Sequence, residues 1–177
     1  DAYNIAVGYN AGIAVTTGVQ NTIIGGLAGD SLTTGNFNIA IGHASLSNED
    51  EGATNIAIGF EALNQLNFNG NGLNVAVGHQ AGGSMTTGIQ NTIIGANAGD
   101  AITTGTENVA LGYQALSSED AHGQNVAVGH NALASLNAGA NALNTAVGYF
   151  AGLNVSTGTH NTLIGANAGD ALTTGAG

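Results

Sequence analysis

The sequence predicts an all-β fold: a parallel β-solenoid, either a β-roll or a β-helix, of ten 17–19-residue coils in 70-residue super-repeats. Three observations predict it. A stretch beginning at Asn21 returns almost unchanged at Asn91 and again at Asn161, so its copies follow one another at a constant interval. Within each of the first two super-repeats, or blocks, a shorter unit recurs four times, at spacings of 17, 17, 17 and 19, and two further units follow in the third block. Each unit opens with an Asn, a short apolar run and a Gly.

The first residue of every unit is an asparagine, which we number position 1. These residues are Asn4, Asn21, Asn38, Asn55, Asn74, Asn91, Asn108, Asn125, Asn144 and Asn161. Position 5 is Gly in all ten units, which argues against a helix, because Gly inside a helix costs about 1 kcal/mol relative to Ala. A unit of this length is too short for a domain but long enough for one solenoid coil. Coils that stack about 4.8 Å apart would make ten units roughly 48 Å long.

Two columns of identical residues would run along such a solenoid. Side-chain amides at position 1 can hydrogen-bond from coil to coil and satisfy backbone groups at the corner. Glycines at position 5 permit a positive φ or a close approach of neighbouring backbones. Position 12 is apolar in the first, second and fourth units of a block, for example at Val15, Leu32 and Leu66. The two 19-residue units are expected to differ from the others only by a two-residue bulge in one loop, at residues 67–72 and residues 137–141.

The strand is apolar on both of its faces, which predicts burial on both. Position 3 is never polar, and position 4 is always Val, Ile or Leu. We assign position 4 to the coil interior, so that Ile94 is a core residue. Position 3, with Ile23, Ile93 and Leu163 as its bulky members, would then face another copy of the chain. An exposed apolar stripe of this length is unusual on a soluble monomer, so this assignment predicts self-association, as a parallel homo-oligomer or a fibre.

Composition limits the classes of partner. The chain has no Lys or Arg and a formal net charge of −11. Because phosphates are bound by Lys and Arg, this argues against nucleic acid and against anionic membrane surfaces. No apolar run approaches the ~20 residues of a membrane-spanning helix, so we expect no membrane insertion. Residues 1–177 are expected to form a single continuous array that is a section of a longer fibre.

The motifs "NIAVG", "NVAVG" and "NTAVG", with "NVALGYQAL" at 108–116 and "NTAVGYFAG" at 144–152, resemble two related groups of repeats. These are the head repeats of trimeric autotransporter adhesins and the "NTAIG"-type arrays of phage tail-fibre-like proteins. The resemblance covers the whole chain. It implies a trimeric β-roll or β-helix that is extracellular, on a cell surface or on a virion, and that serves as a stalk or an adhesive surface.

Acidic residues cluster at two places in each block. Aspartates stand at position 10 of the second units, and acidic residues crowd the loops "SNEDEG" at 47–52 and "SSEDAHG" at 117–123. Carboxylates beside Asn and Ser oxygens are typical Ca²⁺ ligands, but we favour the simpler interpretation of a solvated edge that keeps a fibre soluble. The Ca²⁺ candidates are Asp30, Glu49, Asp50, Glu51, Asp100, Glu119, Asp120 and Asp170. We expect the two loops to be polar, with nothing that would raise a carboxyl pKa, and no required cofactor.

Position 6 carries His or an aromatic residue in most units, including His43, Phe60, His79, Tyr113, His130 and Tyr149. This equivalence favours packing or a surface stripe, with a His cluster on a three-fold axis as the alternative. Asn154 begins the chain's one N-glycosylation sequon, Asn-Val-Ser.

No arrangement of residues indicates catalysis. There is no Cys, no cation to stabilise an oxyanion and no spacing that marks a catalytic triad. A polysaccharide-degrading β-helix would need a carboxylate cleft that interrupts the repeat, and nothing interrupts it. The sequence therefore predicts a structural fibre or stalk segment that is not an enzyme. The alternative is an adhesive surface on the same solenoid that binds a glycan or a host receptor.

Overall fold

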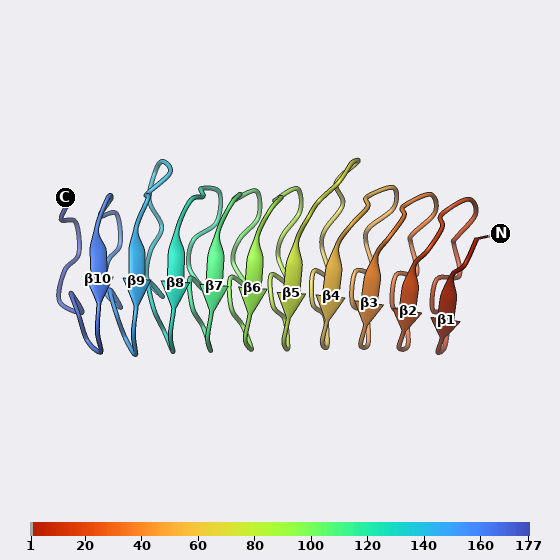
Figure 1. The fold of residues 1–177 in the computed structure, drawn as a ribbon, viewed down its shortest axis with the longest axis horizontal. Helices are drawn as coiled ribbons and strands as arrows, with labels where there is room; N and C mark the ends of the chain where they lie inside the picture. The colour runs from red at the N-terminus through yellow and green to blue at the C-terminus, as the bar shows by residue number, and fades with distance from the viewer. Residues whose placement is uncertain (1) are drawn as a thin grey trace.

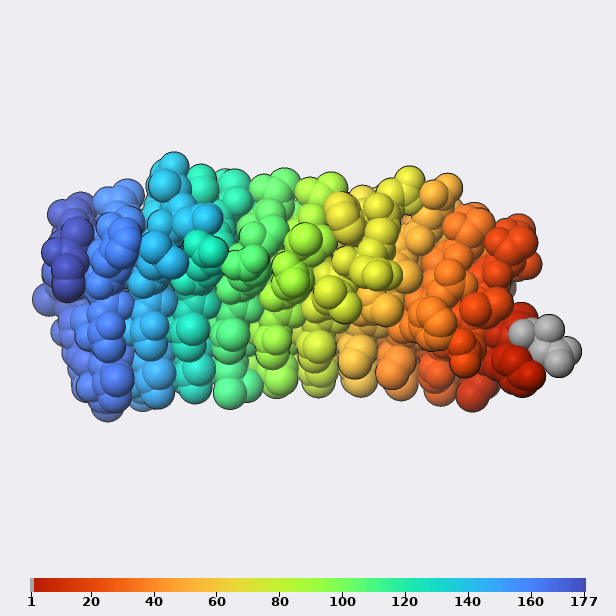
Figure 2. Space-filling view, turned by 45° about the horizontal axis from the view of Figure 1, so that its top comes forward, coloured from red at the N-terminus to blue at the C-terminus, as the bar shows by residue number. Residues whose placement is uncertain are grey.

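The computed structural model describes residues 2–177 and confirms the predicted parallel β-solenoid. Its ten strands form one sheet in chain order, with every neighbouring pair parallel (Figure 1). The strands are β1 (Ile5–Val7), β2 (Thr22–Ile24), β3 (Ile39–Ile41), β4 (Ile56–Ile58), β5 (Val75–Val77), β6 (Thr92–Ile94), β7 (Val109–Leu111), β8 (Val126–Val128), β9 (Thr145–Val147) and β10 (Thr162–Ile164). Figure 2 shows the coils as successive bands along one elongated body.

Each strand ends at the position-5 glycine, where the chain turns. Gly42, which follows β3, has a φ of 131°, and a Cβ there would overlap the backbone of Gly59 in the next coil. The same conformation recurs at position 5 of all ten coils. Only glycine combines this φ with so close an approach, so the strands are limited to three residues.

The asparagines of position 1 stack in one column, as predicted. From Asn21 onward, the backbone N–H of each donates to the side-chain oxygen of the asparagine one coil earlier, at 2.8–3.3 Å. In every 17-residue coil, the side-chain amide also donates to the carbonyl at position 15 of its own coil, at 2.7–3.1 Å. The column therefore links successive coils and also closes each 17-residue coil.

The interior is lined by position 3, and our assignment of position 4 to the interior is wrong. Ile23 and Ile93 are fully buried, whereas Ile24 is 37% exposed and Ile94 is half-buried. Leu163 packs against the same core. The physical reason is parity: positions 1 and 3 point to the same side of a strand, and the position-1 amides must lie inside to close the coils. Because these bulky residues fill their own chain's interior, position 3 cannot be the contact between chains.

The 70-residue super-repeat is a packing pattern of this interior. Where position 9 is Gly, the space is filled from position 3 of the same coil or the next one. A Cβ on Gly82 would lie 3.0 Å from Leu63 Cδ2 and 3.1 Å from Ile93 Cδ1, so the glycine makes room for both side chains. In the third and fourth coils of a block, position 9 is Leu and position 3 is Ala, for example Leu63 and Ala57. Protein interiors are packed near crystal density, so a large side chain at position 3 requires a small residue at the neighbouring position 9, and the reverse.

The two 19-residue coils keep the register of the sheet, as predicted. Strand β4 still pairs with β5, and β8 with β9, residue for residue. The extra residues extend the loops that follow β4 and β8, which rise above the neighbouring loops in Figure 1. The position-1 amides of these coils, on Asn55 and Asn125, bond instead to the carbonyls of Ala53 and Gly123, two residues earlier.

Candidate functional site

The outward side of the sheet is the first candidate surface, and we call it the outer face. It consists of positions 2 and 4 of β1–β10. These side chains are Val, Ile, Leu or Thr, and most are half-buried. The most exposed members away from the ends of the sheet include Leu111 (41%) and Val147 (36%). The outer face is therefore a largely apolar strip that the chain does not cover itself.

Position 6 lies beside the outer face and forms two stacks of rings, which we call the aromatic columns. In the first, Phe60 stacks between His43 and His79, with ring centroids 5.4 and 5.2 Å apart. In the second, His130 lies between Tyr113 and Tyr149 at 5.2 Å from each. This confirms that the histidines pack with aromatic residues of neighbouring coils.

The aromatic columns have a fixed length because the second unit of each block has no ring at position 6. Ala96 separates the two columns, and Gly26 precedes the first. Stacked pairs of this kind contribute about 0.5–1.5 kcal/mol beyond simple burial. Because the faces of the inner rings are used within a column, ring edges remain for outside contacts, and Tyr113 and Tyr149 stay 47% and 52% exposed.

The acidic loops are built differently from our expectation of solvated polar loops. Glu49 and Glu119 occupy position 12, the column that is apolar in the other coils, and both are fully buried. Glu49 Oε1 accepts hydrogen bonds from the N–H groups of Asp50 (3.1 Å) and Gly52 (2.8 Å). Its Oε2 accepts one from the N–H of Phe68 in the following 19-residue coil (3.3 Å).

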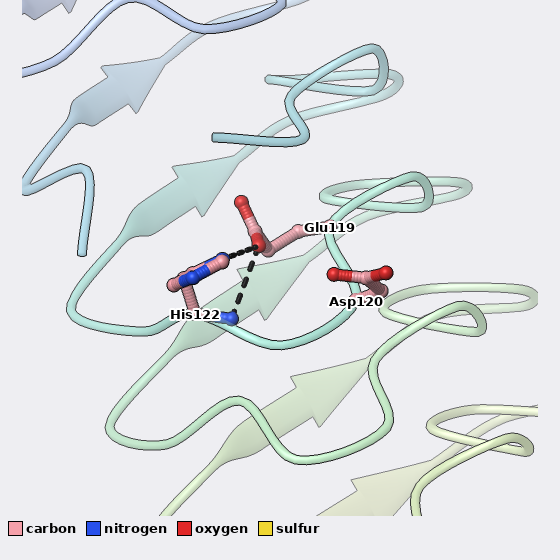
Figure 3. A group of neighbouring side chains, drawn as sticks. All are labelled: Glu119, Asp120 and His122. Carbon is pink, nitrogen blue, oxygen red and sulfur yellow. Dashed lines mark hydrogen bonds and ion pairs between the residues drawn. The ribbon is translucent and has the colours of Figure 1, made fainter. Parts of the chain in front are cut away.

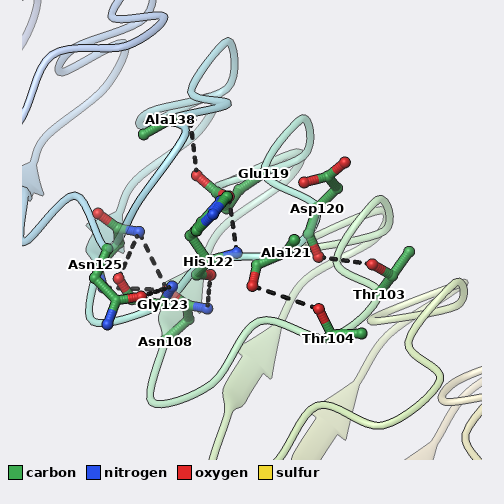
Figure 4. A network of polar contacts seen from close by, with 11 residues as sticks. Thr103, Thr104, Asn108, Glu119, Asp120, Ala121, His122, Gly123, Asn125 and Ala138 are labelled. Atoms are coloured by element: carbon green, nitrogen blue, oxygen red, sulfur yellow. Dashed lines mark hydrogen bonds and ion pairs between the residues drawn. The ribbon is translucent and has the colours of Figure 1, made fainter.

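Glu119 repeats this arrangement in the second block. It accepts from the N–H of His122 at 3.1 Å and from that of Ala138 in the next coil at 3.3 Å. Figure 4 shows it at the centre of a polar network in which Asn108 also donates to the His122 carbonyl. Each buried glutamate thus precedes a 19-residue coil and supplies acceptors for backbone donors around the long loop. The signal was present in the sequence as a glutamate interrupting an apolar column.

Burial raises the pKa of the Glu49 carboxyl above its ordinary value, mainly by desolvation. The backbone N–H groups that it accepts from counteract this shift, led by that of Gly52. The expectation that nothing in these loops would raise a carboxyl pKa is therefore wrong. The cause is that position 12 points into the apolar interior rather than into the loop's solvent.

Glu119, Asp120 and His122 offer ligand atoms within 4.8 Å of one another (Figure 3), the one such group of three within residues 2–177. His122 Nδ1 lies 3.4 Å from Glu119 Oε1. Both oxygens of Glu119 already accept backbone hydrogen bonds, and the first block has Gly52 where His122 stands. A Ca²⁺ site needs six to eight oxygen ligands, so the geometry favours a structural role for Glu119.

The other Ca²⁺ candidates are spread along the solenoid. Asp30, Asp100 and Asp170 stand at position 10 of coils that are four apart, so they share no site. Asp50 accepts a hydrogen bond from the Thr33 hydroxyl one coil earlier. The side chain of Glu51 is exposed. These positions provide isolated carboxylates and no common centre.

The sequon asparagine, Asn154, is exposed and its amide donates to the Asp170 carbonyl at 2.7 Å. Among residues 2–177 there is no helix of the length and apolar character that crossing a membrane would require. Comparisons with protein-family models, curated proteins and solved structures found no match to this chain.

Proposed function

We propose that the protein is a structural segment of an extracellular fibre or stalk, and that it performs no catalysis. One observation carries the proposal: all ten coils are joined to their neighbours by the same in-register strand pairing and by the continuous asparagine column. Each further coil therefore lengthens the rod and leaves its cross-section unchanged. Repeat proteins of this kind are stabilised by contacts between neighbouring repeats, as a stalk of adjustable length requires.

A length series tests this role. Chains extended by one or two further 70-residue blocks are imaged by electron microscopy beside the original chain. Four coils rise about 19 Å, so each added block is expected to lengthen the rod by that amount while its width stays constant. Compact particles, or an increase in width instead of length, would contradict the proposal.

We further propose that the rod is a parallel homo-oligomer, a trimer by the resemblance to adhesin and tail-fibre repeats. The support is the outer face, because its Val, Ile and Leu side chains form an apolar strip along the whole sheet. Soluble monomers rarely leave such a strip exposed, and cyclic closure would cover it in every chain. Mass photometry is expected to give three times the chain mass of 17.2 kDa, and a species of 17.2 kDa alone would contradict the trimer.

An adhesive surface is the second candidate function, and the aromatic columns favour it. Their exposed ring edges lie beside the apolar outer face, a combination that is common at recognition surfaces. A glycan or a host-surface receptor is the proposed ligand. Binding on a glycan array that Tyr113→Ala abolishes would support adhesion, whereas the absence of binding on glycan and host-cell surfaces alike would leave the stalk role alone.

A further inference from the structure

The long loop that follows β4 contains the chain's two Asn-Gly pairs, Asn69-Gly70 and Asn71-Gly72. An asparagine before a glycine is prone to deamidation, because glycine has no side chain to hinder the approach of its backbone nitrogen to the asparagine amide. Asn-Gly is also common turn chemistry, so the motif alone does not identify a reactive site. The surroundings of the two pairs differ, and they decide which pair can react.

The second pair, Asn71-Gly72, is protected. The N–H of Gly72 donates to the carbonyl of Ala53 at 2.9 Å, and Gly72 is buried. Asn71 and Ala53 form a parallel bridge between the two coils. Deamidation requires the glycine nitrogen to lose its proton and turn toward the asparagine side chain. A nitrogen whose N–H is hydrogen-bonded inside the coil can do neither.

The first pair, Asn69-Gly70, is open to solvent. Both residues are exposed, and within residues 2–177 no hydrogen bond engages the side chain of Asn69 or the N–H of Gly70. The loop is anchored on either side of the pair. The N–H of Phe68 donates to Glu49 at 3.3 Å, and the carbonyl of Gly70 accepts from the N–H of Ala53 at 2.8 Å. Neither contact occupies the atoms that would react.

The fold requires glycine at position 70 of the chain. Gly70 has a φ of 150°, in a region that is essentially restricted to glycine, and a Cβ there would lie 3.1 Å from Cε1 of the Phe68 ring. The equivalent loop after β8 contains no Asn-Gly pair, because Gly139-Ala140 and Asn141-Ala142 stand in these places. The second loop is therefore an internal control for the first.

We propose that Asn69 is a deamidation site of the folded protein. The deprotonated nitrogen of Gly70 attacks the side-chain carbonyl carbon of Asn69 and forms the new C–N bond of a cyclic succinimide. The bond from that carbon to the side-chain nitrogen breaks, and the nitrogen leaves as ammonia after taking up a proton. Water then opens the ring at either carbonyl and gives aspartate or isoaspartate. Nothing is oxidised or reduced, and water is the only co-reactant.

The modification adds one negative charge to a chain whose formal net charge is −11. The loop contains no residue of the outer face or of the aromatic columns. The modified protein should therefore keep both surfaces and differ in the charge of the loop after β4.

The test incubates the whole folded chain in H₂¹⁸O at mildly alkaline pH, so that each new acid carries ¹⁸O. The chain has no Lys or Arg for trypsin, but chymotrypsin cuts after Phe68 and Leu73 and releases both pairs in one peptide, whose fragmentation assigns the label. We expect label at Asn69, with Asn71 labelled at least about tenfold more slowly, as for a site that reacts only after local opening. In urea the two asparagines should react at similar rates.

Matched variants identify the reacting residue. Asn69→Gln should abolish the rapid labelling, because the longer side chain forms the ring less readily, whereas Asn71→Gln should leave the rate at Asn69 unchanged. Asn141 should stay unlabelled over the same period. The proposal is overturned if Asn69 gains no label in the folded chain, if Asn71 is labelled as fast as Asn69 there, or if Asn71→Gln rather than Asn69→Gln removes the acidic product.

Discussion

The carboxylate of Glu119 accepts a hydrogen bond from the backbone N–H of Ala138, 3.3 Å away, across the boundary between a 17-residue and a 19-residue coil. Glu49 and Phe68 repeat this relationship in the preceding block. Two buried acids without a cation of the Lys or Arg type would be unexpected in a core this narrow. The hydrogen bonds that they accept explain why these acids are buried. The longer coil places backbone N–H groups beside position 12, and the glutamate carboxylate accepts from them where no backbone carbonyl does.

The first prediction concerns this acceptor role. Glu119→Gln replaces one of the two carboxylate oxygens with an NH₂ group, which cannot accept a hydrogen bond. The backbone N–H of either His122 or Ala138 then loses its acceptor. A loss of about 1–3 kcal/mol in the free energy of unfolding is expected, measured by urea titration. Asp120→Asn, an exposed neighbour in the same loop, is the control and should be nearly neutral. Equal effects would assign Glu119 to the solvated surface.

The second prediction is a pH dependence that follows from the raised pKa of Glu49. Its folded-state pKa lies above that of the unfolded chain, so the native state binds the proton more tightly. The stability that the protonated Glu49 carboxyl contributes is fully present below the ordinary pKa of about 4.5. It is lost as the pH rises through the raised pKa of the folded state. Stability should therefore fall as pH is raised across this window.

A matched pair of variants isolates the contribution of Glu49 from general repulsion among the acidic residues. Glu49→Gln should flatten the plot of unfolding free energy against pH, whereas Glu51→Gln in the same loop should leave its slope unchanged. Chemical denaturation at a series of pH values, from the ordinary carboxyl pKa up to neutrality, provides the measurement. A slope that Glu49→Gln leaves unaltered would refute the assignment.

The third prediction concerns the complementary sizes of positions 3 and 9. Gly82→Ala introduces a methyl group 3.0–3.1 Å from Leu63 and Ile93 at a residue whose φ is 59°, and should cost about 1–3 kcal/mol through overpacking and the left-handed backbone. Ile93→Ala should cost about 2–5 kcal/mol through cavity formation. The double variant is expected to be less destabilised than the sum, because each change relieves the other. Strict additivity would show that the two positions do not share space.

The fourth prediction concerns backbone strain at position 17. Thr54 adopts a φ of 60°, a region that β-branched residues disfavour and that Asn tolerates. Because the left-handed region costs most L-residues roughly 1–2 kcal/mol and Asn less, Thr54→Asn is expected to raise stability by about 1 kcal/mol, seen as a melting temperature a few degrees higher. Thr17→Asn is the control, because Thr17 is exposed and lies outside the left-handed region. No gain at Thr54 relative to Thr17 would contradict this account of strain.

The repeat alone was enough to predict the solenoid, the asparagine column and the position of the loop bulges, because these depend only on spacing. The face of the strand that points into the coil was predicted wrongly. Both faces are apolar, so no alternation of polar and apolar residues marks the inner one. A subtler signal was available: position 2 accepts Thr at Thr22 and Thr92, which marks that face as the outer one. The backbone donors that Glu49 and Glu119 meet could not be predicted, because they depend on where the longer coil that follows places its N–H groups.

The measurement that most directly tests the central claim compares Ile93→Asp with Ile94→Asp. The two residues are adjacent in β6, and the claim is that Ile93 lies inside the coil while Ile94 lies on the outer face. An unpaired charge in the interior is severely destabilising, so Ile93→Asp should abolish the cooperative thermal transition. Ile94→Asp should retain that transition at a moderately lower temperature. Loss of folding at Ile94 with tolerance at Ile93 would contradict the account.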